Sequence, residues 1–255
     1  MSVQVNPDDP ALLAAVATRV GEARRLLREI ADTFSPAAFA SSLGAEDMVL
    51  TDLIVHDRLD IEIFSLDTGR LPPETYDLIA AVKNRYGLTL RLYSPRHELV
   101  EAYTRSNGIN AFYESVELRK ACCFVRKVEP LQRALAGRKA WITGMRGGQA
   151  ATRDGLPVRS FDAANGDGGL EKFNPLAAWS EREVWAYLKL NDVPYNALHA
   201  KFYPSIGCAP CTRPITPGED VRAGRWWWEA PDTKECGLHL VDGRLQRVAA
   251  QGVTA

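Results

Sequence analysis

Two pairs of cysteines that lie far apart in the chain are the side chains best suited to act together chemically. Cys208 and Cys211 form a C-x-x-C, and Cys122 and Cys123 are adjacent. Four thiolates can complete the ligand shell of a zinc ion or of an iron–sulfur cluster. Adjacent thiolates would strain one tetrahedral zinc, whereas each can bind a different iron of a cluster, so we favour a [4Fe-4S] cluster over zinc. The sequence thus predicts that two distant segments converge on one site.

Two other interpretations of these cysteines stay open. The four thiols can be buried structural side chains, or Cys208 and Cys211 can form a thioredoxin-like dithiol. Neither explains why Cys122 stands beside Cys123. The fifth cysteine, Cys236, belongs to neither pair, and the odd total argues against a disulfide framework. Cys236 is therefore a candidate reactive thiol.

The composition bounds the class of protein. A chain of 255 residues, 46% of them apolar, can bury one sizeable core, and we expect a domain over 1–215 followed by a C-terminal tail over 216–255. A net charge of -1 gives no general attraction to nucleic acid or to an acidic membrane, so local cations must bind any anion. We find no signal-peptide pattern and no apolar run that could span a bilayer, and expect a cytoplasmic protein.

Short apolar runs alternate with segments of helical periodicity along most of the chain. The runs that we predict as strands are Ala37–Ser41, Ile61–Leu66, Leu88–Tyr93 and Ala140–Thr143. The predicted helices are Pro10–Phe34, a segment around Met48–Leu53, Pro72–Tyr86, His97–Arg105, Glu114–Leu135 and Ser180–Leu190. This order predicts an α/β fold with a single doubly wound, mostly parallel sheet flanked by helices. Ligands of such folds bind at the carboxyl ends of the strands.

Polar turns follow three of the predicted strands at that edge of the sheet. The first, Ser41-Ser42-Leu43-Gly44, precedes a helix. Such a turn can cradle phosphate with N–H groups, hydroxyls and the helix N-terminus, but alone it is a weak signal, because it is more often an ordinary N-cap. Asp67 follows the second strand as either a ligand contact or a turn residue. Arg146 follows the fourth strand, just after Gly144, and is a candidate anion contact.

The segment around the adjacent cysteines is rich in cations. They are Arg119, Lys120, Arg126 and Lys127. We expect them to lower the pKa values of the thiols and to offset the negative charge of a thiolate-ligated cluster. The alternative is a solvated basic face of a helix. Lys127 lies four residues after Cys123, on the same side of the predicted helix, where it would bridge cluster and substrate.

The predicted tail combines arginines with three consecutive tryptophans. Arg222 and Arg225 stand three residues apart and suit a divalent anion such as sulfate or phosphate, which a guanidinium binds with forked hydrogen bonds. Trp226, Trp227 and Trp228 cannot all point inward on any regular element. Packing of the tail against the domain explains them at least as well as stacking on a base.

Taken together, these motifs resemble the assimilatory adenylyl-sulfate reductase family, the cluster-containing relatives of the phosphoadenylyl-sulfate reductases. The resemblance covers nearly the whole chain. It rests on Ser-Leu-Gly-Ala-Glu-Asp at 42–47, Leu-Asp-Thr-Gly-Arg at 66–70, Cys-Cys at 122–123, Thr-Gly-Met-Arg at 143–146, Gly-Cys-Ala-Pro-Cys at 207–211, Arg-Ala-Gly-Arg-Trp-Trp-Trp-Glu at 222–229 and Lys-Glu-Cys-Gly-Leu-His at 234–239. Some of these motifs are weak alone, but in this order they are highly specific.

The resemblance implies a fold of the adenine-nucleotide α-hydrolase type and a set of site residues. It implies a [4Fe-4S] cluster on the four paired cysteines and a nucleophile at Cys236. The positions that it implies for substrate binding, together with those chosen from the residues above, are Ser41, Ser42, Gly44, Asp47, Leu66, Asp67, Thr68, Gly69, Lys127, Gly144, Arg146, Arg222, Arg225 and His239. Leu66 would lie near the adenine. His239 would orient sulfate or set the protonation state of the thiol, or it is merely exposed.

The chemistry that the resemblance implies is the reduction of adenylyl sulfate to sulfite and AMP. Cys236 would attack the sulfate sulfur, AMP would leave, and reduced thioredoxin or a similar dithiol would release sulfite from the S-sulfocysteine. The first turn departs from the Ser-Gly-Gly-x-Asp-Ser loop of ATP pyrophosphatases at Leu43 and at 46–48, which suits a phosphosulfate better than a triphosphate. We expect the tail to close over the nucleotide and to reopen for the dithiol.

Three alternative functions remain open at this point. The substrate can be 3′-phosphoadenylyl sulfate with the same chemistry, because the sequence does not show what lines the ribose 3′ side. The chain can be a nucleotide- or redox-sensing module whose cluster reports oxidation. It can also be an ATP-dependent thiolation or adenylation enzyme, against which the altered first turn argues. Homo-oligomers are common in the family, and the sequence leaves the oligomeric state open.

Overall fold

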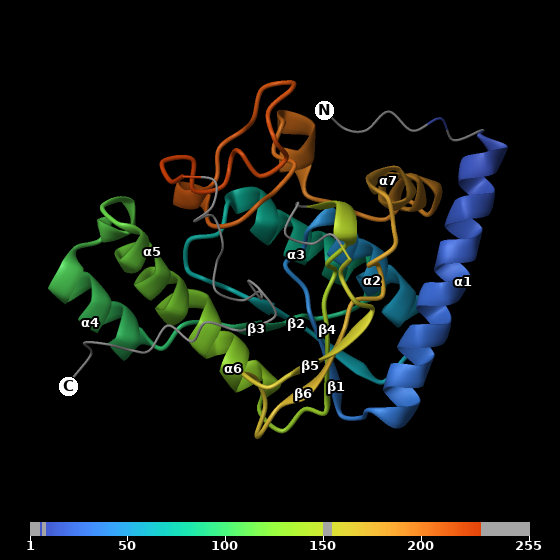
Figure 1. Ribbon diagram of the computed structural model, residues 1–255, viewed down its shortest axis with the longest axis horizontal. Helices are drawn as coiled ribbons and strands as arrows, with labels where there is room; N and C mark the ends of the chain where they lie inside the picture. The colour runs from blue at the N-terminus through green and yellow to red at the C-terminus, as the bar shows by residue number, and fades with distance from the viewer. Residues whose placement is uncertain (1–5, 7–8, 150–154, 231–255) are drawn as a thin grey trace.

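A single six-stranded sheet forms the centre of the molecule (Figure 1). The computed structural model describes residue 6 and residues 9–149 and 155–230. The strands are β1 (Ala37–Ala40), β2 (Ile61–Leu66), β3 (Arg91–Tyr93), β4 (Ala140–Ile142), β5 (Arg159–Asp162) and β6 (Leu170–Phe173). Their order is β3-β2-β1-β4-β6-β5, and every neighbouring pair is parallel except β5 with β6. The predicted doubly wound, mostly parallel sheet is confirmed.

Helices cover both faces of this sheet (Figure 1). They are α1 (Pro10–Thr33), α2 (Ala45–His56), α3 (Pro73–Tyr86), α4 (His97–Asn107), α5 (Val116–Cys123), α6 (Glu129–Leu135) and α7 (Glu181–Leu190). Apolar side chains of α1, α2, α3 and α7 form the larger core on one face, and those of α6 form a smaller core on the other. No helix in the described part of the chain is long and apolar enough to cross a bilayer.

The alternation of side chains along each strand explains why both faces of the sheet are apolar. Ala37 and Phe39 of β1 belong to the larger core, whereas Ala38, between them, belongs to the smaller one. On β4, Ile142 and Trp141 divide between the two cores in the same way. Successive side chains of a strand point to opposite faces, so strands buried on both sides must be almost continuously apolar.

The predicted strands all exist, but two further strands were missed. The third strand is shorter than predicted, because it begins at Arg91 instead of Leu88. The missed pair, β5 and β6, forms an antiparallel hairpin around the Gly-rich loop over 163–169. Phe161 of β5 is exposed and Asp162 is buried, so this edge strand lacks the apolar pattern by which a strand is recognised.

The helix predicted over Glu114–Leu135 is interrupted by one wider turn. α5 ends at Cys123, a π-helical segment covers Phe124–Val128, and α6 follows directly. A π-helical turn changes the direction of the side chains around it and occurs often at functional sites. Here it carries Arg126 and Lys127.

The described part of the predicted tail, 216–230, packs against the rest of the molecule. Thr212 and Arg225 form an antiparallel bridge, and the Trp226 N–H donates to the carbonyl of Cys211. Trp226 is buried, Trp228 packs on Phe112, and Trp227 is 40% exposed, which confirms that the three tryptophans do not all point inward. The division at 215 and the movement of the tail stay predictions.

Candidate active site

A cavity of about 280 Å³ opens at the carboxyl ends of β1, β2 and β4. Ten of the residues predicted to bind substrate line it: Ser41, Ser42, Gly44, Asp47, Leu66, Lys127, Gly144, Arg146, Arg222 and Arg225. They come from the turns after β1 and β4, from the first turn of α2, from the end of β2, from the π-helical segment and from the packed part of the tail. Their contact with a substrate stays a prediction, but the fold does bring them to one place.

The first turn is organised by the carboxylate of Asp47. This carboxylate accepts hydrogen bonds from the backbone N–H (2.5 Å) and the hydroxyl (2.6 Å) of Ser42. The N-cap of α2 is Gly44, which has no side-chain cap, so the hydroxyl of Ser42 holds the turn instead of capping the helix. Burial raises the pKa of Asp47 to about 6, although the Ser42 hydrogen bonds oppose the rise.

Asp47 also joins the first turn to the turn after β4. A Cβ atom on residue 144 would overlap Oδ1 of Asp47, so only glycine fits there. Arg146, two residues later, pairs with Glu46 at 2.7 Å, and both side chains are mostly buried. The guanidinium of Arg146, which we predict to contact an anion of the substrate, therefore already pairs with a carboxylate.

Asp67, Thr68 and Gly69 do not line this cavity. Asp67 Oδ1 accepts hydrogen bonds from the Gly69 N–H (2.9 Å) and the hydroxyl of Tyr76 (2.8 Å), so the side chain acts as a turn residue. The carbonyl of Thr68 accepts a hydrogen bond from Arg126 at 2.8 Å, and its hydroxyl lies 3.3 Å from the Cys208 sulfur. This turn thus faces the paired cysteines, and its predicted nucleoside contacts stay predictions.

A second, smaller cavity brings the two cysteine pairs together. Its lining includes Cys122, Cys123, Cys208 and Cys211, with Arg70, Arg119, Arg126 and Lys127. The N–H of Ala209 donates to the carbonyl of Arg70 (2.8 Å), and the hydroxyl of Tyr113 donates to the carbonyl of Pro210 (2.8 Å). These two bonds hold the C-x-x-C loop against the segments that follow β2 and α4.

The free thiols are harder to ionise than the nearby cations suggested. Burial raises the pKa of Cys122 against the effect of Arg126, and burial together with the sulfur of Cys208 raises the pKa of Cys211 to about 12. The prediction that cations lower the thiol pKa values is therefore wrong for these two cysteines, because burial outweighs the positive charges. Nor is the basic segment a solvated face, since Arg119 is 0% and Arg126 is 9% exposed.

The four cysteine side chains come together, and the cluster that the sequence predicts on them stays a prediction. Within the described residues, no three or more His, Cys, Asp or Glu side chains are placed to hold one metal ion. The four thiols nevertheless line one cavity with four cations, as a polynuclear thiolate-bound centre requires. Lys127 lines this cavity and the larger one, so its side chain lies between the two.

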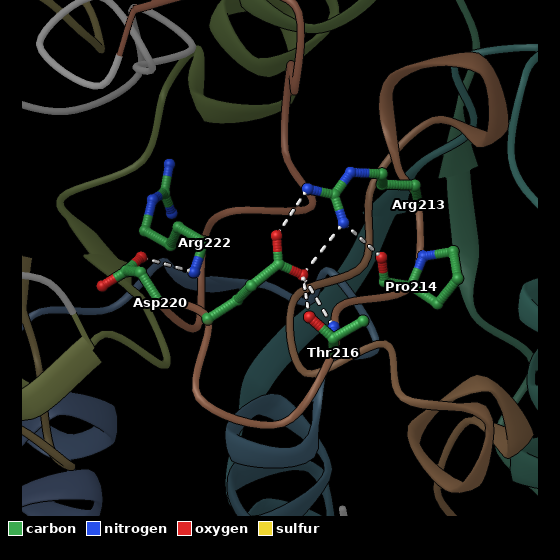
Figure 2. Close-up of polar contacts among 6 residues, drawn as sticks. Arg213, Pro214, Thr216, Asp220 and Arg222 are labelled. Carbon is green, nitrogen blue, oxygen red and sulfur yellow. Dashed lines mark hydrogen bonds and ion pairs between the residues drawn. The ribbon is translucent and has the colours of Figure 1, made fainter.

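The loop before Arg222 is held by a network around Glu219. Its carboxylate accepts two hydrogen bonds from Arg213 (2.8 and 3.1 Å) and one from the Thr216 N–H (2.7 Å), which lower the pKa of Glu219 to about 2. Figure 2 shows Arg213 and Thr216 turned toward this carboxylate, while the guanidinium of Arg222 turns away from it. The network fixes the loop and directs Arg222 to the wall of the larger cavity.

Other residues on the cavity wall escaped prediction from the sequence. Glu46, Trp185 and His199 line the larger cavity, and the rings of Trp185 and His199 pack at 5.2 Å. Glu46 lies inside the motif at 42–47, which could have pointed to it, and Trp185 lies in the helix predicted over Ser180–Leu190. No motif pointed to His199. The predicted nucleophile Cys236 and the predicted His239 lie outside the described residues.

Comparisons with known proteins agree on one family. The model of the phosphoadenosine phosphosulfate reductase domain matches residues 36–214. The adenosine 5′-phosphosulfate reductase of Allochromatium vinosum is 58% identical over 222 residues, which cover 87% of this chain and 86% of that protein. The protein of the same name from Burkholderia cepacia is 54% identical over 230 residues, with 90% and 91% covered.

Solved structures show the same fold. The phosphoadenylyl-sulfate reductase of Candida auris, solved as a phosphate complex, superimposes with a TM-score of 0.64 at 29% identity and covers 84% of this chain and 100% of that one. Yeast FAD synthetase, at 17% identity and a TM-score of 0.53, shares the fold alone; 81% of this chain and 70% of that one are covered. The fold type implied by the sequence motifs is confirmed.

Proposed function

This chain belongs to the phosphoadenosine phosphosulfate reductase family, and on that premise we propose that it reduces adenylyl sulfate to sulfite and AMP, using reduced thioredoxin or a similar dithiol. The supporting observation is the cavity in which Lys127, Arg222 and Arg225 meet the turns after β1 and β4 and the end of β2. Cations gathered in a cavity suit a substrate with adjoining phosphate and sulfate groups. Eight curated relatives, 48–58% identical to this chain, are each named adenosine 5′-phosphosulfate reductase.

In the first step, the Cys236 thiolate attacks the sulfate sulfur of adenylyl sulfate. The bond from sulfur to the bridging phosphate oxygen breaks, AMP leaves with that electron pair, and an S-sulfocysteine remains. The guanidinium groups of Arg222 and Arg225 and the ammonium of Lys127 bind the two anionic groups and stabilise the charge that gathers on the leaving phosphate. Leu66, with Trp141 and Leu131 on the same wall, forms the apolar side for the adenine.

In the second step, a dithiol supplies the two electrons. One of its thiolates attacks the Cys236 sulfur, the sulfur–sulfur bond breaks, and sulfite leaves with the electron pair. The second thiol of the donor then resolves the mixed disulfide, which regenerates the Cys236 thiolate and leaves the donor oxidised. Because both electrons come from the dithiol, no other residue of the chain needs to change oxidation state.

A [4Fe-4S] cluster on Cys122, Cys123, Cys208 and Cys211 is part of this proposal. When bound, it would join the two cysteine segments and place a charged centre beside Lys127. The chain supplies four thiols that must be deprotonated on binding and four cations that offset the charge. An enzyme with this many reduced thiols suits a reducing compartment, and we propose the cytoplasm.

The function is tested by measuring AMP and sulfite release with adenylyl sulfate, 3′-phosphoadenylyl sulfate and ATP, each with and without a reduced thioredoxin. Dithiol-dependent release of sulfite from adenylyl sulfate supports the proposal. Preference for 3′-phosphoadenylyl sulfate keeps the mechanism and changes the substrate. AMP binding without sulfite release points to a sensing module, and pyrophosphate release from ATP points to an adenylating enzyme.

A further inference from the structure

A buried ion pair joins the cysteine-bearing helix to the last described turn of the chain. Arg119 of α5 is 0% exposed, and its guanidinium donates to both carboxylate oxygens of Glu229, at 2.8 and 2.7 Å. The two residues stand 110 positions apart in the sequence. A forked, fully buried pair between arginine and glutamate fixes the position and the angle of both partners.

The same guanidinium holds a strained tryptophan. It lies over the ring of Trp226, 4.7 Å from the ring centroid. Trp226 has a φ of 40°, a left-handed conformation that bulky residues avoid unless their surroundings impose it. Arg119 also interacts with the sulfur of Cys123, so one side chain contacts a predicted cluster ligand, a strained residue and the end of the packed segment.

A second arginine connects this group to the larger cavity. The guanidinium of Arg225 lies over the same Trp226 ring at 4.6 Å and donates to the Ser205 hydroxyl and to the Ile206 carbonyl, both at 3.3 Å. Arg225 and Trp226 both line the cavity that is proposed to hold the nucleotide. The contacts therefore run without a break from the cysteine cavity, through Arg119 and Trp226, to a predicted anion-binding side chain.

We propose that Arg119 is a positioning residue: through Glu229 it fixes the last described turn of the chain, and in this way it helps to align Cys236 with the substrate. Cys236 stands seven positions after Glu229 in the sequence, and an extended chain of that length would reach at most about 24 Å. A fixed starting point limits the volume that the thiol searches, which raises its effective concentration at the sulfate. The inference rests on the proposed function, because it takes Cys236 as the nucleophile.

The test compares two variants with a matched control. Glu229→Gln keeps the shape of the side chain and removes the charge, whereas Arg119→Lys keeps the charge and removes the forked hydrogen bonds. Tyr86→Phe is the control, because it removes one partly buried hydroxyl that donates to Asp52 (2.9 Å), and Tyr86 lines neither cavity. Melting temperature and iron content are recorded for each, so that general loss of stability or of the cluster is recognised.

The rate of trypsin cleavage after Arg225 measures how firmly the packed segment is held, and the measurement does not depend on enzyme activity. Arg225 is 8% exposed in the packed segment, so the wild-type bond is protected. We expect both variants to be cleaved there about tenfold faster or more, as the opening equilibrium shifts, and Tyr86→Phe to match the wild type. Equal cleavage in the variants and the wild type would overturn the inference, whatever the enzyme does.

Single-turnover formation of the S-sulfocysteine measures the alignment. At saturating adenylyl sulfate we expect Glu229→Gln to form the adduct about tenfold more slowly or worse, while its AMP dissociation constant changes by less than about threefold. An unchanged rate, or a loss that follows AMP affinity in proportion, would overturn the positioning role. If the wild type forms no adduct, the proposed function fails, and the trypsin result still decides whether Arg119 anchors the segment.

Discussion

The carboxylate of Asp47 occupies the space that any side chain on residue 144 would need. A Cβ atom on Gly144 would overlap Oδ1 of Asp47 and would lie 3.2 Å from its backbone nitrogen. The same carboxylate holds the N–H and the hydroxyl of Ser42. The turn after β1 and the turn after β4 therefore depend on a single acidic side chain and on a glycine that lets it approach.

Gly144→Ala is expected to destabilise the protein and to weaken nucleotide binding. The added methyl group must displace Asp47 from its place beside Ser42, and overpacking of this kind costs about 1–3 kcal/mol. Urea unfolding and AMP titration measure the two effects. Gly21→Ala is the control, because Gly21 lies within α1 with open space around it, and alanine there should stabilise the helix by about 0.5–1 kcal/mol. A Gly144→Ala variant with wild-type stability and affinity would contradict this account of the turns.

The charge of Asp47 should appear as a pH dependence of stability. Its pKa in the folded protein, about 6, lies above the ordinary value of 3.8 for an aspartate, so folding favours the protonated form. The stabilising contribution is present below pH 3.8 and is lost as the pH rises through 6. We predict that, between those limits, the unfolding free energy of the wild type falls relative to that of Asp47→Asn by about 3 kcal/mol. A difference between wild type and variant that does not change with pH would show that the carboxyl titrates normally.

Much of the fold was predictable because its strands are apolar on both faces. The runs around Phe39, Phe64 and Ile142 could be recognised without any tertiary information, and the polar turns that follow them do meet at one edge. The edge strand β5 was not predictable, since its partner covers one side only and Phe161 remains exposed. Pattern alone cannot distinguish such a strand from a loop.

The sequence predicted which residues form the site, but not which side chains those residues contact. The sequence placed Arg146 and Asp47 at the cavity, yet only the structure shows that Glu46 pairs with the first and Ser42 binds the second. Nor could the sequence show that burial raises the pKa of the Cys211 thiol more than the nearby cations lower it. Contacts between residues far apart in the sequence, such as Arg119 with Glu229, leave no local pattern to read.

Lys127→Met should affect both cavities at once. Its ammonium group lies on the wall between the cysteines and the predicted anion site, so removing the charge should raise the KM for adenylyl sulfate and alter the visible absorption of the bound cluster. Lys120→Met is the matched control, since Lys120 lies about two helical turns earlier and lines neither cavity. Equal kinetics and equal spectra in the two variants would show that Lys127 acts on neither the substrate nor the cluster.

Substitution of single cysteines should separate the cluster ligands from the nucleophile. Serine at position 122, 123, 208 or 211 is expected to lower the iron content of the anaerobically purified protein well below about four atoms per chain, because each sulfur is one ligand of the proposed cluster. Cys236→Ser should retain its iron and lose sulfite production. Full iron content in two or more of the first four variants would contradict the assigned ligand set.

The central claim is tested most directly by the intact mass of the protein after it is mixed, without oxygen, with adenylyl sulfate. The account predicts a sulfite-sized adduct of about eighty daltons, which is absent from Cys236→Ser and disappears when reduced thioredoxin is added. An adduct formed only with 3′-phosphoadenylyl sulfate would contradict the assigned substrate. No adduct with either nucleotide, in protein that binds AMP and contains iron, would contradict the covalent mechanism itself.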